Sequence, residues 1–208
     1  PTLPGEQTIH EQSALISRQA GATDAQVAHE RRMNEEVFAV LKCPIRHESA
    51  REQILSILAS HLKSWQDQPV EDDEVATHIN RMADTVLTPA FRSFLNCEPA
   101  LHFRRVRCPV LALFGELDIQ VPPALHMQVL REALSVAGNP DVTIEEFPGL
   151  NHLFQTATSG AISEYEVIEE TIAPSVLERL SDWIRSRTHD GAAEQQHAAD
   201  VAARRRSC

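Results

Sequence analysis

Asp118 and His152 are the two residues of this 208-residue chain whose types and spacing best suit a shared chemical task. Asp118 follows an apolar run and a turn at Gly115, whereas His152 follows a predicted strand and a Pro148-Gly149 turn. An aspartate can accept the Nδ1–H of a histidine, which leaves Nε2 to act as a general base toward a hydroxyl nucleophile. The two residues therefore form a candidate acid–base pair. The alternative is that Asp118 only caps a turn and His152 is an ordinary loop histidine.

Residues 100–187 carry the pattern that would position this pair. Val106–Phe114 is a near-continuous apolar run, typical of a strand covered on both faces in a parallel sheet. A helix follows from Val121 to Gly138, residues 142–147 alternate as a strand, and Pro174 begins a last helix. In this β-α-β order both polar residues lie at the carboxyl ends of parallel strands, where α/β sheets keep their sites. The last helix is expected to bury an apolar face made of Val176, Leu177, Leu180, Trp183 and Ile184.

Residues 1–99 carry helical patterns and no convincing strand before about residue 90. Four amphipathic helices are predicted, the second opened by a capping-box signal at Thr23 and Gln26. The third has the clearest apolar stripe, and His61 on that stripe is predicted to be a packed histidine rather than a metal ligand. The segment is either an independent helical bundle or a helical insertion packed over another domain.

Two stretches of the second segment resemble α/β-hydrolase serine esterases. Residues 108–122 read CPVLALFGELDIQVP and resemble the acid-bearing strand, while residues 148–155 read PGLNHLFQ and resemble the catalytic-histidine loop. The closest likeness is to EstD-type carboxylesterases, often grouped with serine-aminopeptidase-like hydrolases, and it extends through residues 168–174. The resemblance implies an α/β class, with a partial α/β-hydrolase fold (the last parallel strands and helices) at residues 100–187. It implies that residues 1–99 are the helical cap that precedes this part.

The resemblance also implies roles for individual residues. Asp118 matches the acid position and His152 the base, with Glu116 as the alternative acid. No metal or organic cofactor is implied, and the partner would be a small-molecule ester. Phe91, Phe94 and Trp65 are candidates for lining the cap.

The nucleophile of such a triad is missing from the sequence. No G-x-S-x-G elbow occurs, Ser159 follows the histidine instead of preceding the acid, and Ser49 and Ser64 lie on predicted helices. Because the family order is serine, acid, histidine, we expect the nucleophile and oxyanion-hole donors upstream of Pro1. The isolated chain is then expected to be marginally stable, to self-associate through an uncovered sheet edge, and not to turn over esters.

Composition excludes several other classes of protein. Thirty acidic residues against 19 basic ones give a net charge of −11, which disfavours nucleic acid and anionic membranes as partners. No apolar run reaches the roughly 20 residues of a membrane helix. The four cysteines form no C-x-x-C pair, and no H-E-x-x-H motif occurs, so a disulfide framework and a zinc site are not expected. This cysteine usage favours a reducing compartment such as the cytoplasm. Residues 188–208 are polar and alanine-rich, which predicts a flexible tail.

The sequence thus predicts a carboxylic ester hydrolase with a Ser-His-Asp triad, represented here by its acid and its base. A peptidase or a thioesterase of the same fold would use the same triad. A non-catalytic helical binding or dimerisation module that retains hydrolase remnants is the alternative of a different class.

Overall fold

The computed structural model describes residues 1–65 and 72–188, with side chains described outside residues 63–72. The chain is mostly helical and contains a small two-stranded parallel sheet, an arrangement loosely of the α/β class. Its elements are α1 Gly5–Gln19, α2 Asp24–Lys42, α3 His47–Trp65, α4 Asp72–Val86, α5 Pro89–Leu95, α6 Pro99–Phe103, β1 Val110–Gly115, α7 Pro123–Ala137, β2 Val142–Phe147, the 3-10 turn η1 Ile162–Glu164, and α8 Pro174–Arg185.

The chain divides into two compact units, and each unit is made of two separate stretches of the sequence. The helical unit comprises Pro1–Cys108 and Ile119–Pro140, and the strand unit comprises Pro109–Asp118 and Asp141 onward. Helix α7, predicted as part of the second segment, thus belongs to the helical unit, where it contacts α6. The predicted tail, residues 188–208, lies outside the described residues except for Thr188.

The four helices predicted within residues 1–88 are present, and two more, α5 and α6, follow them. Thr23 begins α2 through the predicted capping box, since its hydroxyl accepts the N–H of Gln26 and the Gln26 side chain accepts the N–H of Thr23. The core of this unit joins α2, α3, α4 and α5 around fully buried side chains that include Phe38, Ala50, Ile54, Leu58 and Ala83. His61 is largely buried: its Nδ1 lies 3.3 Å from His29 Nε2, and its Nε2 lies 3.2 Å from a Glu36 carboxylate oxygen. Hence His61 is a packed, hydrogen-bonded histidine, as predicted.

His10 on α1 is a buried polar side chain against the helical core. Its ring centroid lies 5.3 Å from that of Phe38, and its Nδ1 has no hydrogen-bond partner among the described residues. Burial, reinforced by the charge of Arg31, lowers the pKa of His10 below 6.5. The folded helices therefore favour the neutral imidazole.

Substitution of His10 by leucine is expected to remove part of the acid sensitivity of the protein. Because the unfolded chain binds the proton first, stability is present above pH 6.5 and is lost as the pH falls through the lowered pKa of His10. Urea unfolding at about pH 7.5 and about pH 5 measures this loss. The exposed His78→Leu variant should keep the wild-type pH dependence. An equal loss in wild type and His10→Leu would contradict the assignment.

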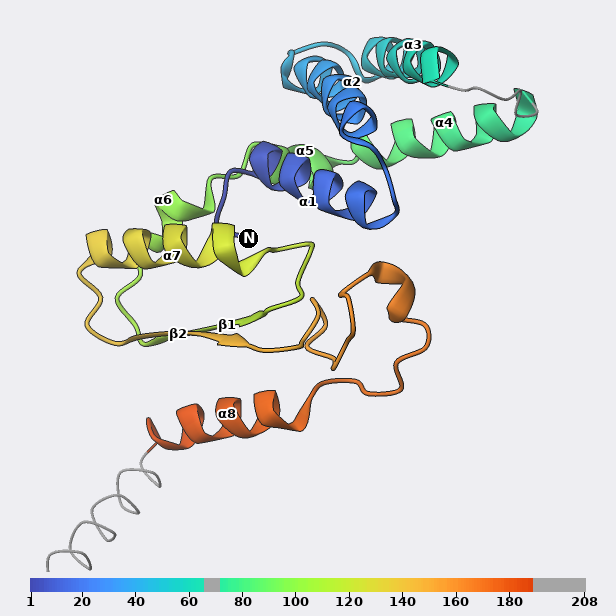
Figure 1. Cartoon of the computed structure of the whole chain (residues 1–208). Coiled ribbons are helices and arrows are strands. Elements are labelled where there is room, and N and C mark those ends of the chain that lie inside the picture. Colours follow the sequence, from blue (N-terminus) through green and yellow to red (C-terminus); the bar gives the residue numbers. More distant parts are fainter. Residues whose placement is uncertain (66–71, 189–208) are drawn as a thin grey trace, which may run out of the picture. The chain divides into compact units, whose positions relative to one another are not determined.

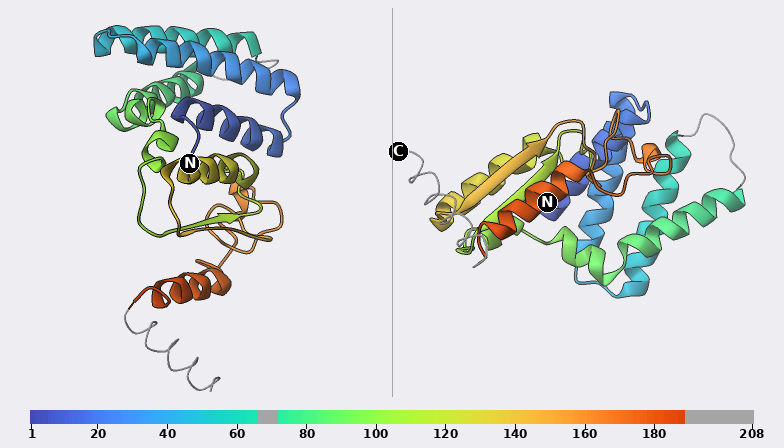
Figure 2. Two further views of the ribbon diagram at one scale, coloured as in Figure 1. Left: turned by 90° about the vertical axis from the view of Figure 1, so that its left-hand side faces the viewer. Right: turned by 90° about the horizontal axis from the view of Figure 1, so that it is seen from below.

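The strand unit is built on the parallel pair β1 and β2, which run side by side in Figures 1 and 2. Val110 pairs with Val142 and Gly115 with Phe147, so both strands end at the same edge. The predicted strand began at Val106, but β1 begins at Val110, because Pro109 has no N–H to donate to a ladder. Residues 110–113 are only partly buried, which corrects the expectation of a strand covered on both faces.

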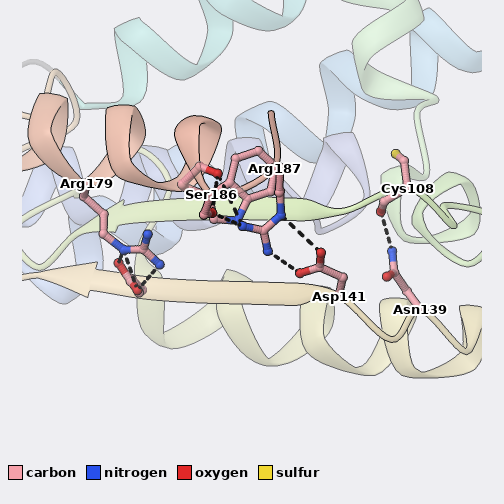
Figure 3. A network of polar contacts seen from close by, with 8 residues as sticks. Cys108, Asn139, Asp141, Arg179, Ser186 and Arg187 are labelled. Atoms are coloured by element: carbon pink, nitrogen blue, oxygen red, sulfur yellow. Dashed lines mark hydrogen bonds and ion pairs between the residues drawn. The ribbon is translucent and has the colours of Figure 1, made fainter. Parts of the chain in front are cut away.

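Helix α8 lies along β2 and is held there by charged side chains (Figure 3). Arg179 forms a bidentate pair with Glu145, with Nε–Oε2 at 2.6 Å, and Arg187 pairs with Asp141. The Arg187 guanidinium also stacks over the Trp183 ring, 4.1 Å from its centroid. Of the predicted buried face, only Val176 is buried, whereas Leu177, Leu180 and Ile184 are 50%, 41% and 47% exposed. The prediction of a wholly buried face is therefore wrong for these three residues.

A candidate acid–base pair at the end of the sheet

Asp118 lies in the tight turn that directly follows β1. Its N–H donates to the carbonyl of Gly115, and the N–H of Leu117 donates to the carbonyl of Leu150, at 3.1 and 2.8 Å. The turn is thereby hydrogen-bonded to the loop that follows β2. The Asp118 side chain is 7% exposed, so its carboxylate is largely shielded from water.

His152 lies in that second loop, and its imidazole reaches the buried carboxylate. Its Nδ1 is 2.9 Å from Asp118 Oδ2, and its side chain is 36% exposed. A neutral histidine that donates Nδ1–H here keeps its lone pair on Nε2. Within the described part of the strand unit, no group hydrogen-bonds Nε2. The structure brings the two predicted residues together, and the arrangement is able to transfer a proton at Nε2.

Gly115 allows the two loops to approach this closely. A Cβ atom at this position would lie 2.4 Å from the carbonyl oxygen of Leu150 and 2.5 Å from that of Asn151. No side chain fits between β1 and the histidine loop, because both nearest atoms belong to backbone. The glycine is visible in the sequence, but the close approach that requires it is not.

Glu116, the alternative acid, serves a different contact. Its side chain is exposed, and Oε2 accepts the N–H of Gly149 at 2.8 Å. The carboxylate therefore braces the turn that leads into the histidine loop. The residue opposite Nδ1 of His152 is Asp118.

The histidine loop contains two buried side-chain amides that the sequence did not predict to be functional. Asn151 is fully buried and Gln155 is 7% exposed, and their side chains are hydrogen-bonded to each other. Asn and Gln are mostly exposed residues, so a sequence pattern gives little reason to place them in a core. Their only sequence signal is their position in the loop that carries the histidine.

Ser159, the serine nearest in sequence to His152, is engaged in its own loop. Its hydroxyl donates to Glu164 Oε1 at 2.9 Å, and the N–H groups of Ser159 and Gly160 also donate to this carboxylate. Burial opposes ionisation of Glu164, but these hydrogen bonds outweigh it and hold the pKa of Glu164 below its ordinary value. The loop packs against the acid turn, since a Cβ at Gly160 would lie 1.9 Å from the carbonyl oxygen of Leu117. Ser159 is thus a structural residue of this loop.

The remaining predicted residues lie in the helical unit. Ser49 is half-buried in α3, and Phe91 packs against the helical core with its ring centroid 6.2 Å from that of Phe38. Phe94 is half-buried in α5. The side chains of Ser64 and Trp65 lie outside the described residues. A lining role for Phe91, Phe94 and Trp65 stays a prediction.

The described residues contain neither a metal-binding cluster nor a membrane-spanning helix. No group of three or more His, Cys, Asp or Glu side chains is arranged to hold a metal ion there. No helix among these residues is long and apolar enough to cross a bilayer. Comparison with protein-family models, curated proteins and solved structures finds no match to this chain.

Proposed function

We propose that Asp118 and His152 are the acid and the base of a serine hydrolase that acts on carboxylic esters. One observation carries the proposal: a shielded carboxylate lies 2.9 Å from Nδ1 of a histidine whose side chain is one-third exposed. Burial on one side and access on the other are what a proton-transfer histidine needs. An ordinary surface ion pair would leave both partners in water.

The chemistry follows from the direction of this hydrogen bond. Nε2 of His152 takes the proton of a serine hydroxyl while the serine oxygen bonds to the ester carbonyl carbon. His152 then returns the proton to the departing alkoxide, and the acyl group remains on the serine. Water, deprotonated in the same way, hydrolyses the acyl-enzyme. At each step Asp118 stabilises the imidazolium and keeps the ring oriented, and no organic cofactor is needed.

The proposal assigns the nucleophile to sequence outside these 208 residues, since they contain no G-x-S-x-G elbow. Under the same proposal, residues 100–187 are the last part of an α/β-hydrolase core and the helices of residues 1–99 are its cap. A peptidase or thioesterase would use the pair in the same way. These enzyme classes differ in the acyl group and the leaving group of the substrate, and not in the roles of Asp118 and His152.

A fluorophosphonate probe tests the proposal, because it bonds to an activated serine. We expect it to label the longest product of the gene that contains these residues, and to lose that labelling in the His152→Ala variant. The 208-residue chain should remain unlabelled and should not turn over p-nitrophenyl acetate. Hydrolysis by the short chain that disappears with His152→Ala would contradict the assignment of the nucleophile.

The exposed apolar residues of α8 favour the second candidate, a non-catalytic binding or dimerisation module. Leu177, Leu180 and Ile184 lie on one side of a helix, and each is at least 41% exposed. The same probe separates the two candidates. A longest gene product that is folded but unlabelled would support the binding module.

A further inference from the structure

We infer that Asn151 is a positioning residue that acts together with Gln155 to hold His152 on Asp118. The inference rests on the proposed function, because it concerns how the same base is oriented. It goes further in assigning the orientation to two buried amides in addition to the Asp118 carboxylate.

The backbone on both sides of His152 is held by Asn151. The Asn151 Oδ1 accepts the N–H of Leu153 at 2.9 Å and the N–H of Gln155 at 3.0 Å. The Asn151 backbone N–H donates to the Gln155 carbonyl, and its carbonyl accepts the N–H of Phe154. His152 lies between these anchored residues, and its own backbone makes no hydrogen bond within the described strand unit. The orientation of its imidazole therefore depends on these anchored neighbours and on the hydrogen bond to Asp118.

Asn151 and Gln155 form a series of hydrogen bonds that begins and ends at backbone groups, and these backbone groups determine how both side-chain amides are oriented. Asn151 Oδ1 faces backbone donors, so its Nδ2 donates to Gln155 Oε1 at 3.0 Å. Gln155 Nε2 then donates to the carbonyl of Glu170 at 2.9 Å. Neither amide can flip without placing an N–H against an N–H or an oxygen against an oxygen. The network thus has a single arrangement.

The loop that this network closes contains a strained residue. Phe154 has a φ of +57°, the left-handed conformation that side-chain-bearing residues rarely adopt. Such a conformation persists only where the surroundings over-determine it, and it is frequent at functional sites. Here Phe154 is held by three contacts: its N–H donates to Asn151, its carbonyl accepts the N–H of Ala173 at 2.8 Å, and it packs against the apolar cluster of Leu150, Ala173 and Val176.

The far end of the network is the segment that leads into α8. Glu170 supplies its carbonyl to Gln155 and its carboxylate to the N–H of Thr156 at 2.6 Å. The histidine loop is thus joined to residues 170–173 by three hydrogen bonds. A loop tied at both sides permits little drift of the ring, and catalytic geometry is sensitive to displacements of about 1 Å.

Nitrogen-15 NMR of the histidine rings in the 208-residue chain tests the inference without any need for activity. In wild type we expect neutral His152 in the Nδ1–H tautomer, with a low-field proton shared with Asp118. Asn151→Ala should lose this signal and move His152 toward the Nε2–H tautomer that free histidine prefers. Gln155→Ala removes the partner of Asn151 Nδ2 and the link to Glu170, and should weaken the signal as well. On the longest gene product, Asn151→Ala should lower kcat by about 10- to 100-fold with little change in KM.

Asn139→Ala is the matched control, since Asn139 is also an amide that donates to backbone carbonyls. Its partners are the carbonyls of Val106 and of Cys108, and Figure 3 shows the bond to Cys108. The substitution lies in the helical unit and should leave the His152 signal unchanged. A folded Asn151→Ala or Gln155→Ala variant that keeps the full wild-type signal would overturn the inference. Absence of the signal in wild type would instead contradict the Asp118–His152 pair, and hence the proposed function.

Discussion

Replacement of His152 by alanine is expected to lower kcat for p-nitrophenyl acetate by about 10⁴- to 10⁶-fold in the longest product of the gene. The variant removes the group that accepts the serine proton in the proposed mechanism. Asp118→Asn should cost about 10³- to 10⁴-fold, because an amide next to Nδ1 stabilises the wrong tautomer and cannot stabilise the imidazolium. Steady-state kinetics of each variant provide the measurement.

Two matched variants control for general effects of these substitutions. His102→Ala removes an exposed histidine on α6, and Asp182→Asn removes an exposed carboxylate on α8. Both should leave kcat within about twofold of wild type, as expected for exposed positions away from the pair. Undiminished turnover by Asp118→Asn would show that another group carries the acid role.

Replacement of Gly115 by alanine is expected to destabilise the strand unit by about 3 kcal/mol, at the upper end of the usual cost of overpacking. The new methyl group would overlap two backbone carbonyl oxygens, at 2.4 and 2.5 Å, and neither can rotate away as a side chain can. The histidine loop must then move from β1, which separates His152 from Asp118. Urea unfolding measures the stability, and the low-field Nδ1–H signal of His152 reports the separation.

Gly149→Ala is the control for Gly115→Ala. Gly149 has a φ of +69°, but a Cβ there would meet nothing within 4 Å. Its substitution should cost only the left-handed backbone term, about 1 kcal/mol. Equal losses of stability in Gly115→Ala and Gly149→Ala would show that the close approach of β1 to the histidine loop does not add to the cost of Gly115→Ala.

Local signals predicted most of the helix ends correctly. The capping box at Thr23, the first-turn proline of α8 and the left-handed Gly138 at the end of α7 were all readable, because their partners lie within a few residues. The strand β1 was predicted to begin four residues too early, since an apolar run does not show where pairing with β2 begins. The short helices α5 and α6 were missed, because seven and five residues are too few for a periodic pattern.

Burial was harder to predict than helicity. The spacing of apolar residues in α8 correctly indicated a helix, yet three of the five residues on its predicted buried face are exposed. Periodicity states which residues share a face, and only the surrounding elements decide whether that face is covered. The side-chain amides of Asn151 and Gln155 are the converse case, since these polar residues are buried and hydrogen-bond to each other.

By itself, the sequence determined the longer helices, the two strands and the candidates Asp118 and His152. The tertiary structure alone decided that Asp118, and not Glu116, lies against Nδ1 of His152. It also decided that Gly115 leaves room for the histidine loop to approach β1 and that Asn151 hydrogen-bonds within that loop. The physical reason is one of distance along the chain. Caps and periodicity are satisfied by neighbours three or four residues away, whereas the acid and the base are 34 residues apart and meet only when β1 and β2 pair in register.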